Sequence, residues 1–404
     1  MTIGVGGSTA AAELAKLQSA RDIVPPIGPE ERQARIAKAQ ALMRAQGVSA
    51  LYLDASTAAF YFTGLRLRGS ERLHGAVIPA EGDVAYITPA FEQAKLETMI
   101  TLPGRIHAWQ EHEDPTSLVV DAVRAMGYAG GTIAIDPATP FFTVEGLRRA
   151  GNSFDFINAQ PITAACRMVK SAGEIALMRH AMNLTLAVHR ATAAILRPGI
   201  TTTEVEAFVA RAHTALGFDL PASFCIVLFG EATAYPHGVP YPQTLQLGDT
   251  VLVDIGAPMH GYQSDVTRTY VFGEPSPRQR EVWDVEKRAT EAVFAAARLG
   301  ATCESLDRAA RDVIEGAGFA REYGLPGLPH RTGHGIGLDV HEEPYIVRGD
   351  RTQLVPGMCF SNEPTICIYG EFGVRLEDHI HMTETGPAWF TPPSPSIDDP
   401  FGLG

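Results

Sequence analysis

The sequence predicts a two-domain fold, with an α/β domain over residues 1–165 and an α+β domain over residues 166–404. The chain has 404 residues, which is more than one ordinary hydrophobic core accommodates. Its first part alternates helical and strand patterns, as α/β domains do. Its second part instead combines long amphipathic helices with two long hairpins.

The first domain is predicted from short apolar runs that are separated by helical patterns. Residues 1–28 are expected to form an arm with one short helix, and residues 30–47 carry the apolar stripe of a helix that stops at Gly47. A further helix is predicted at residues 121–126. Strands are expected at residues 50–53, 76–78, 84–87 and 132–135.

A long helix is predicted to open the second domain. Residues 168–196 repeat apolar side chains with a helical period, and Pro198-Gly199 ends the pattern. Ser171 is the candidate N-cap, and Glu174 follows three residues later as in a capping box. Further helices are predicted at residues 204–216, 278–299 and 305–316.

Charge and cysteine content restrict the partners and the compartment. A formal net charge of −13, from 33 Lys and Arg against 46 Asp and Glu, argues against nucleic acid as a partner. The five cysteines form no CxxC motif, which favours free thiols in a reducing compartment. Because neither a signal peptide nor a spanning apolar run of about 18 residues is visible, we expect a cytoplasmic protein with no membrane partner.

The first hairpin, residues 250–273, carries two acids. If its turn is centred between Met259 and His260, Asp254 lies opposite Asp265, with Cβ atoms about 5 Å apart. Two facing carboxylates on an apolar strand pair need a proton, a basic side chain or a divalent cation to neutralise them. Arg268 lies three residues from Asp265 and so points to the other face, which favours the cation.

The second hairpin, residues 358–382, repeats the pattern. A turn at Gly370 places Glu363 opposite Glu377. Between the hairpins, His334 is flanked by glycines that let the backbone approach a site closely. A single histidine is more often a satisfied core residue, but His334 lies beside two further histidines, which favours a metal ligand.

Four carboxylates and one imidazole suit hard or borderline divalent ions such as manganese, cobalt, iron or zinc. Five such side chains suffice for two ions a few ångströms apart. A pair of this kind lowers the pKa of a water molecule and polarises a carbonyl oxygen. The reaction class expected from the residues is therefore metal-assisted hydrolysis of an amide-like bond.

Three sequence segments resemble signatures of the pita-bread metallopeptidases, which include methionine aminopeptidase, Xaa-Pro aminopeptidase and prolidase. The segments are VDIGAPMHGYQSDVTRTY, HRTGHGIGLDVHEEP and NEPTICIYGEFGVRLED, and YPHGVP at residues 235–240 adds to the match. The N-terminal domain and the junction MVKSAGEIALMRHA resemble the creatinase/prolidase branch. The resemblance implies a creatinase-like α/β N-terminal domain and a pita-bread α+β catalytic domain.

The resemblance also implies a role for each metal ligand. Asp254 would chelate one ion, and Asp265 and Glu377 would bridge both. His334 and Glu363 would hold the second ion. Glu363 would in addition act as the general base that accepts a proton from the nucleophilic water.

Four further residues receive roles from the resemblance, and three of them have a structural alternative. His237 and His341 would be catalytic histidines that stabilise the oxyanion or bind the substrate backbone. As alternatives, His237 is a loop residue that Pro236 orders, and His341 caps or packs under Pro344. Arg375 would support the site near Glu377 and contribute to substrate binding, or simply balance the surrounding acids. His330 would contact the substrate.

The expected activity is that of a metal-dependent Xaa-Pro dipeptidase acting on a proline-containing dipeptide or short peptide. An Xaa-Pro aminopeptidase acting on longer peptides is the main alternative. A metal-free creatinase-type amidinohydrolase should have replaced metal ligands, and a non-catalytic interaction module should have lost ligands or catalytic histidines. We expect two divalent ions, manganese first and zinc, cobalt or iron as alternatives, and a homodimer as in relatives.

Overall fold

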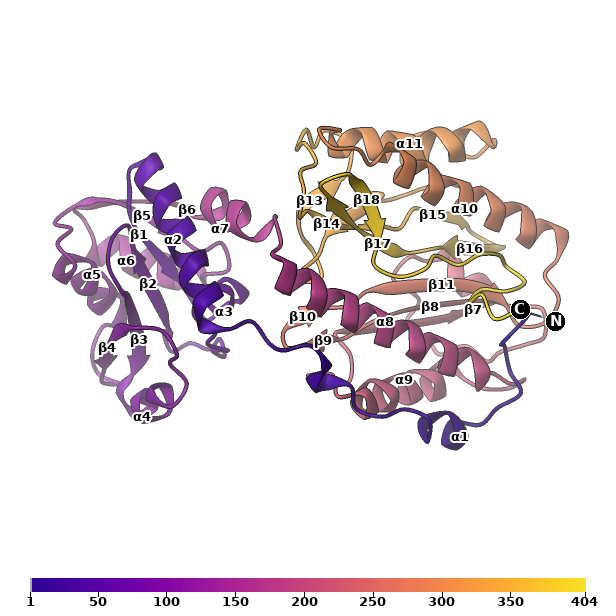
Figure 1. The fold of residues 1–404 in the computed structure, drawn as a ribbon, viewed down its shortest axis with the longest axis horizontal. Coiled ribbons are helices and arrows are strands. Elements are labelled where there is room, and N and C mark those ends of the chain that lie inside the picture. The colour runs from indigo at the N-terminus through magenta and orange to yellow at the C-terminus, as the bar shows by residue number, and fades with distance from the viewer. Residues whose placement is uncertain (1) are drawn as a thin grey trace. The chain divides into compact units, whose positions relative to one another are not determined.

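The structure, a computed structural model, describes residues 2–404 and divides them into two compact units. One unit comprises Ile27–Arg167. The other comprises the chain up to Pro26 together with Met168–Gly404. The junction after Arg167 lies two residues from the boundary expected from the sequence. Figure 1 colours the two units by residue number.

The unit Ile27–Arg167 is built on a mixed six-stranded sheet with the strand order β4-β3-β2-β1-β5-β6. Strand β2 pairs antiparallel with both β1 and β3, whereas the other ladders are parallel. The strands are β1 (Val48–Leu53), β2 (Gly75–Pro79), β3 (Val84–Pro89), β4 (Gly104–Trp109), β5 (Gly131–Ile135) and β6 (Phe154–Asn158). The edge strands β4 and β6 were not predicted, because their half-exposed residues form no apolar run.

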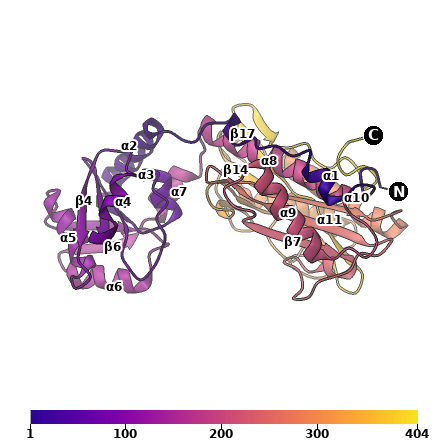
Figure 2. The ribbon, with the colours of Figure 1, turned by 90° about the horizontal axis from the view of Figure 1, so that it is seen from below.

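Helices cover both faces of this sheet. Helices α5 and α6 pack on one face, where Val119 and Leu147 join Tyr52 and Val77 in the core, and α2 with α7 lies on the other (Figure 2). The helices are α2 (Pro29–Gln46), α3 (Thr57–Thr63), α4 (Gln93–Glu97), α5 (Pro115–Ala125), α6 (Phe141–Ala150) and α7 (Gln160–Arg167). Helix α2 ends at Gly47, which has the left-handed φ of 68° that such a stop requires.

The second unit places helices outside a layer of strands (Figure 1). Helices α8 and α9 share one core with β7, β8 and β11, and α10 and α11 share another with β14 to β17. The helices are α1 (Ala10–Leu14), α8 (Ala172–Ala194), α9 (Thr202–Leu216), α10 (Pro277–Ala296) and α11 (Cys303–Gly316). The predicted capping box of Ser171 and Glu174 is present at the start of α8.

The strands of this unit form two larger sheets and two short ribbons. The three-stranded sheet has the order β11-β8-β7 and the five-stranded sheet the order β13-β12-β14-β17-β18. The strands are β7 (Phe224–Phe229), β8 (Thr250–Gly256), β9 (Pro258–Met259), β10 (Tyr262–Gln263), β11 (Val266–Val271), β12 (Gly333–Gly335), β13 (Glu342–Ile346), β14 (Cys359–Asn362), β15 (Thr365–Ile368), β16 (Phe372–Arg375), β17 (Asp378–Thr383) and β18 (Gly386–Trp389).

The N-terminal arm differs from the prediction, which assigned it to the first domain. The Thr2 hydroxyl donates to the carbonyl of Val271 at 2.8 Å, and the Gly6 N–H donates to the carbonyl of Ala193 at 2.9 Å. Leu14 and Leu17 pack against the core under α8 and α9. The arm is too short to bury these side chains by itself, so tertiary contacts decide to which unit it belongs.

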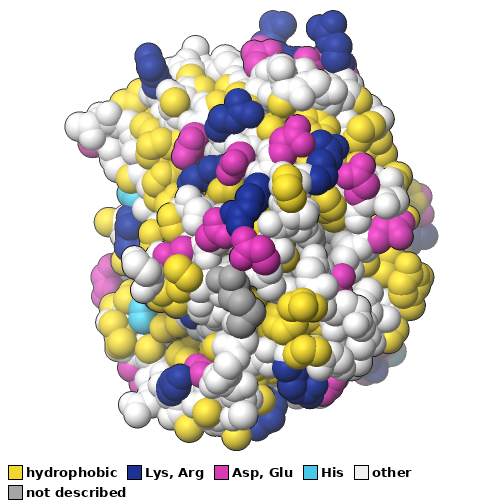
Figure 3. Space-filling model, turned by 90° about the vertical axis from the view of Figure 1, so that its right-hand side faces the viewer, with side chains coloured by type: hydrophobic (Ala, Val, Ile, Leu, Met, Phe, Trp, Pro, Cys, Tyr) yellow, Lys and Arg dark blue, Asp and Glu magenta, His cyan; other side chains and the backbone are white. Residues whose placement is uncertain are grey.

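The second unit has a mixed charged surface. On the face seen in Figure 3, acidic and basic side chains lie next to one another. Some oppositely charged side chains of this unit form ion pairs, such as Arg278–Glu281 at 3.0 Å at the start of α10. Exposed pairs contribute at most about 1 kcal/mol each. Among the described residues, no helix combines the length and apolar character needed to cross a bilayer.

The first hairpin corrects the predicted register. Asp254 is paired with Thr267, not with Asp265, because the turn residues are His260 and Gly261 rather than the Met259-His260 centre expected from the sequence. His260 and Gly261 have φ values of 51° and 92°, as a two-residue type I′ turn requires. The pairing shifts by two residues, so Asp265 stays on the same face as Asp254.

The second hairpin confirms its predicted register. Thr365 pairs with Arg375, and Asn362 pairs with Asp378, so Glu363 falls opposite Glu377 by count. The ladder is interrupted at these two positions, where the Glu363 N–H donates to Thr332 and the Glu377 N–H donates to Thr267. The interruption frees both acids from the regular sheet.

Replacing Gly256 with alanine is expected to destabilise the chain by about 1–3 kcal/mol, because an added Cβ would lie 2.0 Å from the carbonyl oxygen of Ser264. The free energy of unfolding from denaturant titration measures the effect. Gly316, at the end of α11, is the matched control, since nothing lies within 4 Å of its added Cβ. Equal stability of the Gly256→Ala and Gly316→Ala variants would contradict the packing argument.

Candidate active site

The two hairpins bring their acids together next to β12. Asp254 lies on β8, Asp265 immediately precedes β11, Glu363 follows β14 and Glu377 precedes β17. The Nε2 atom of His334, on β12, lies 3.0 Å from Glu363 Oε1 and 3.6 Å from Asp265 Oδ2. All five predicted metal ligands therefore gather in one place.

These side chains form overlapping groups whose donor atoms could hold a metal ion. One group joins Asp254, Asp265 and Glu377, and another joins His334, Glu363 and Glu377, with all donor atoms of a group within 4.8 Å of one another. Except for the partly exposed Glu363, these residues are buried, with exposures of 7% for Asp254 and 1% for Glu377. Burying several ionised carboxylates so close together raises their free energy unless a cation compensates their charge.

Protein side chains supply only part of that compensation. Arg375 donates to Asp254 Oδ2 at 2.6 Å, so its ion pair is with Asp254, although the charge of Glu377 also acts on its pKa. Arg268 instead pairs with Asp378 at 2.8 Å, as its predicted orientation away from Asp265 requires. One carboxylate oxygen of Asp254 and one of Glu377 are buried without a hydrogen-bond partner. Unpartnered, converging oxygens fit divalent cations.

The pKa values reflect the same crowding. Burial and the neighbouring carboxylates raise the pKa of Asp265 and that of Glu377 well above their ordinary values. Burial also raises the pKa of Asp254, although Arg375 opposes the shift. Glu363 differs, because the effect of its burial is outweighed by His334, which lowers the pKa of Glu363. Of the four carboxyls, Glu363 is thus the one that its protein neighbours keep ionised.

The orientation of His334 suits a metal ligand. Its Nδ1 atom lies 3.0 Å from the carbonyl of Gly335, which can only accept a hydrogen bond. Nδ1 therefore carries a proton, and Nε2 is the nitrogen directed at the carboxylates, where a cation would take the place of its own proton. The Ser361 hydroxyl links the two sides of the group, since it accepts from the His334 N–H at 2.8 Å and donates to Glu363 Oε1 at 3.1 Å.

A pocket of about 620 Å³ opens onto this group. The four remaining predicted site residues, His237, His330, His341 and Arg375, also line it. The ring of His341 lies 4.0 Å from that of His334, centre to centre. Burial and the nearby His334 lower the pKa of His341 to about 4, so His341 is a neutral hydrogen-bonding group at neutral pH.

The sequence reasoning missed His379. Its side chain is fully buried, and it forms a third possible metal-binding group with Asp265 and His334. Burial, and then the charge of His334, lower its pKa to about 3. A signal was present in the sequence, since His379 lies two residues after Glu377 on a predicted strand and so shares its face.

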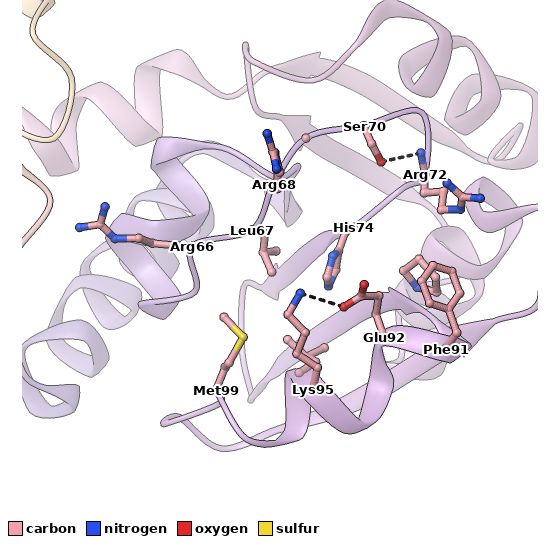
Figure 4. A pocket seen from close by; sticks show the side chains of 13 residues that line it. Arg66, Leu67, Arg68, Ser70, Arg72, His74, Phe91, Glu92, Lys95 and Met99 are labelled. Carbon is pink, nitrogen blue, oxygen red and sulfur yellow. Dashed lines mark hydrogen bonds and ion pairs between the residues drawn. The ribbon is translucent and has the colours of Figure 1, made fainter. Parts of the chain in front are cut away.

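A second pocket, of about 410 Å³, lies within the unit Ile27–Arg167 (Figure 4). Three of its basic side chains already have local contacts. Lys95 pairs with Glu92 at 3.0 Å, Arg72 pairs with Glu111 at 3.0 Å, and Arg66 stacks on Phe60. Figure 4 shows His74 beside the Lys95–Glu92 pair, without the convergent acids of the larger pocket. The chemistry is concentrated in the second unit.

Residues 176–384 match the sequence pattern of the family described as Metallopeptidase family M24. The chain belongs to this family. Residues 35–169 match the Creatinase/Prolidase N-terminal domain, which confirms the predicted two-domain architecture of the creatinase/prolidase branch. The chain is therefore a metallopeptidase-family hydrolase with a creatinase-like N-terminal domain and a pita-bread catalytic domain.

Relatives cover most of the chain. A probable dipeptidase PepE of Mycobacterium bovis is 39% identical over 87% of this chain and 92% of its own length. An Xaa-Pro dipeptidase of Lactobacillus helveticus is 34% identical over 82% of this chain and 89% of its own. The crystal structure of dipeptidase PepE from Mycobacterium ulcerans has a TM-score of 0.83 and 36% identity, covering 91% of this chain and 97% of that one.

Chelation of bound metal is expected to lower the melting temperature by an amount that grows with pH. In the metal-free protein, the pKa values of Asp265 and Glu377 are raised above their ordinary values of 3.8 and 4.5. The folded state therefore binds these protons more tightly than the unfolded state, and this stabilises the fold fully at a pH below the ordinary pKa values. The stabilisation is lost as the pH rises through the raised pKa values of the folded state. Bound cations remove this loss because they compensate the ionised carboxylates. Thermal denaturation between about pH 5 and 8, with and without chelator, measures the difference.

The complementary measurement is the metal content of the purified protein. A difference in melting temperature that stays constant with pH would contradict the assigned carboxyl pKa shifts. Absence of stoichiometric metal, together with insensitivity to chelator, would instead favour the metal-free creatinase-type alternative.

Proposed function

We propose that this protein is an Xaa-Pro dipeptidase with two divalent metal ions, held by Asp254, Asp265, His334, Glu363 and Glu377. The buried group of four carboxylates and one imidazole, with unpartnered oxygens facing a pocket, carries the proposal. The dipeptidase names of the relatives support the substrate class. When bound, the two ions lower the pKa of a water molecule and polarise the scissile carbonyl.

Glu363 is the general base of the proposed reaction. Its carboxylate has a lowered pKa and lies at the pocket, with a side-chain exposure of 15%. It accepts the proton of the attacking water and passes it to the departing proline nitrogen. The oxygen of this water bonds to the carbonyl carbon and the C–N bond breaks, which leaves a free carboxylate and the secondary amine of proline.

The pocket histidines act on the substrate. His341 and His237 donate hydrogen bonds to the carbonyl oxygen as negative charge develops on it. His330, whose Nδ1 donates to the carbonyl of Arg331 at 2.6 Å, is held in a fixed orientation for substrate binding. Arg375 positions Asp254 through its 2.6 Å ion pair and contributes to substrate binding only through that carboxylate.

The proposed preference for proline rests on the missing N–H group of the scissile bond. The tertiary amide bond before proline has no N–H, so peptidases that bind that group handle it poorly. None of the assigned residues here needs to accept a hydrogen bond from the scissile nitrogen. The oxygen-rich ligand set favours manganese, with zinc, cobalt or iron as alternatives.

Two further proposals concern the state of the protein in the cell. All five cysteines are free, which supports a reducing, cytoplasmic compartment. The homodimer is proposed from the resemblance to the creatinase/prolidase branch. Size-exclusion chromatography with light scattering tests the dimer directly.

Replacing Glu363 with glutamine is expected to lower kcat by at least about 100-fold, because the amide cannot accept the proton of the attacking water. Steady-state hydrolysis of Ala-Pro, with metal content measured on the same samples, provides the readout. Glu371→Gln is the control, since Glu371 lies at the exposed turn of the same hairpin and pairs with Arg278 at 3.2 Å. Near-normal turnover of Glu363→Gln would show that another group is the base.

Substrate length distinguishes the two peptidase alternatives. We expect kcat/KM for Ala-Pro to exceed that for Ala-Pro-Ala by at least about tenfold, a difference of about 1.4 kcal/mol in transition-state binding. Ala-Ala serves as the control for the proline requirement. If the tripeptide is the better substrate, the protein is an Xaa-Pro aminopeptidase and the dipeptidase assignment is wrong.

A further inference from the structure

His379 lies on the face of β17 that points to the carboxylate group. It follows Glu377 by two residues, and side chains two apart on a strand share a face. Asp378, which lies between them, points the other way and accepts from Arg268 at 2.8 Å. The alternation along this short segment therefore directs both Glu377 and His379 toward the site.

The imidazole of His379 is buried without a hydrogen-bond partner. Its exposure is 0%, and neither Nδ1 nor Nε2 makes a hydrogen bond. The backbone of Asp265 acts on the ring as a weak hydrogen-bond acceptor, which raises the pKa of His379 slightly, but the contact falls short of full hydrogen-bond geometry. Buried polar side-chain atoms without any partner are uncommon, and each one calls for an ion, a water or a ligand to satisfy it.

The surroundings of the ring indicate which of these fits. One nitrogen of His379 lies within 4.8 Å of donor atoms of both Asp265 and His334. The rings of His379 and His334 lie 6.1 Å apart, centre to centre, at an interplanar angle of 66°. Two imidazoles bound to one cation adopt separated, inclined rings of this kind, whereas a direct hydrogen bond between them would need closer nitrogens.

We propose that His379 is a second imidazole ligand of the metal centre and binds, together with Asp265 and His334, the ion on the His334 side. This inference rests on the metal centre of the proposed function but not on its substrate. It makes the two ion positions chemically different. Asp254, Asp265 and Glu377 offer oxygen only, which suits manganese, whereas two imidazoles at the other position favour zinc, cobalt or iron.

Cobalt-substituted protein tests the proposal through spectroscopy. Metal-free wild-type chain is loaded with two equivalents of Co(II), and X-ray absorption counts the imidazoles bound to cobalt. We expect two imidazoles per two cobalt ions in the wild type and one in His379→Ala. A wild-type count of one overturns the proposal without any variant, so the test does not depend on the folding of the variant.

Binding titrations add a second readout. Removing a direct ligand is expected to weaken the tighter Co(II) site by more than the 10–100-fold that is typical for loss of an indirect partner. The affinity of the other site should change by less than about threefold if it has only oxygen ligands. His379→Gln keeps the side-chain bulk and should show the same loss, which separates ligation from packing.

His213→Gln is the matched control. His213 is also fully buried, with an unpartnered Nε2, but lies on α9 and belongs to none of the possible metal-binding groups of the described residues. Its imidazole count and Co(II) affinities should equal those of the wild type. If His379→Ala weakens binding while the imidazole count stays the same as in the wild type, His379 only positions Asp265 and the proposal is wrong.

The outcome is separable from the peptidase assignment. A protein that binds cobalt through two imidazoles yet leaves Ala-Pro intact would refute the proposed substrate and keep His379 as a ligand. A protein that cleaves Ala-Pro with a single imidazole on its metals would refute the role of His379 alone.

Discussion

Four carboxylates lie close together in the interior of the second unit with one arginine in direct contact. Burial raises the free energy of each ionised acid, and each neighbour raises it further, as the raised pKa values of Asp265 and Glu377 reflect. Arg375 compensates Asp254 but leaves other oxygens unpartnered. The arrangement is therefore suited to cations, and the surrounding structure serves to hold mutually repelling groups in place.

The scaffold holds these groups by joining the two hairpins to each other. Thr267 donates to Glu377 Oε2 at 2.6 Å and, through its backbone, bridges to the same residue. Arg268 donates to the carbonyl of Glu377 at 2.9 Å and to Asp378. Because these bonds run between hairpins that are about 110 residues apart in the sequence, neither hairpin could orient its acids alone.

Different residues of the site have different electrostatic surroundings, and this divides their tasks. His334 lowers the pKa of Glu363 and so favours its ionised form, whereas burial and the neighbouring carboxylates raise the pKa values of Asp265 and Glu377 and so favour their protonated forms. His341 stays neutral, so it can donate or accept a hydrogen bond without bringing a charge into the pocket. The unit Ile27–Arg167 contains a pocket of its own, but there Lys95, Arg72 and Arg66 already have local partners.

The sequence by itself determined the two-domain architecture, the hairpin of Glu363 and Glu377, and the set of acids around His334, because strand alternation and turn residues are local properties. It placed Asp254 opposite Asp265 wrongly, since the turn at His260 and Gly261 is selected by backbone conformation and shifts the register by two.

Only the tertiary structure decided the remaining features. It assigned the N-terminal arm to the second unit, paired Arg375 with Asp254 and brought His379 next to Asp265 and His334. Each of these depends on contacts between segments far apart in the chain. The distance in sequence between such partners leaves no periodic signal, so only the packed fold fixes them.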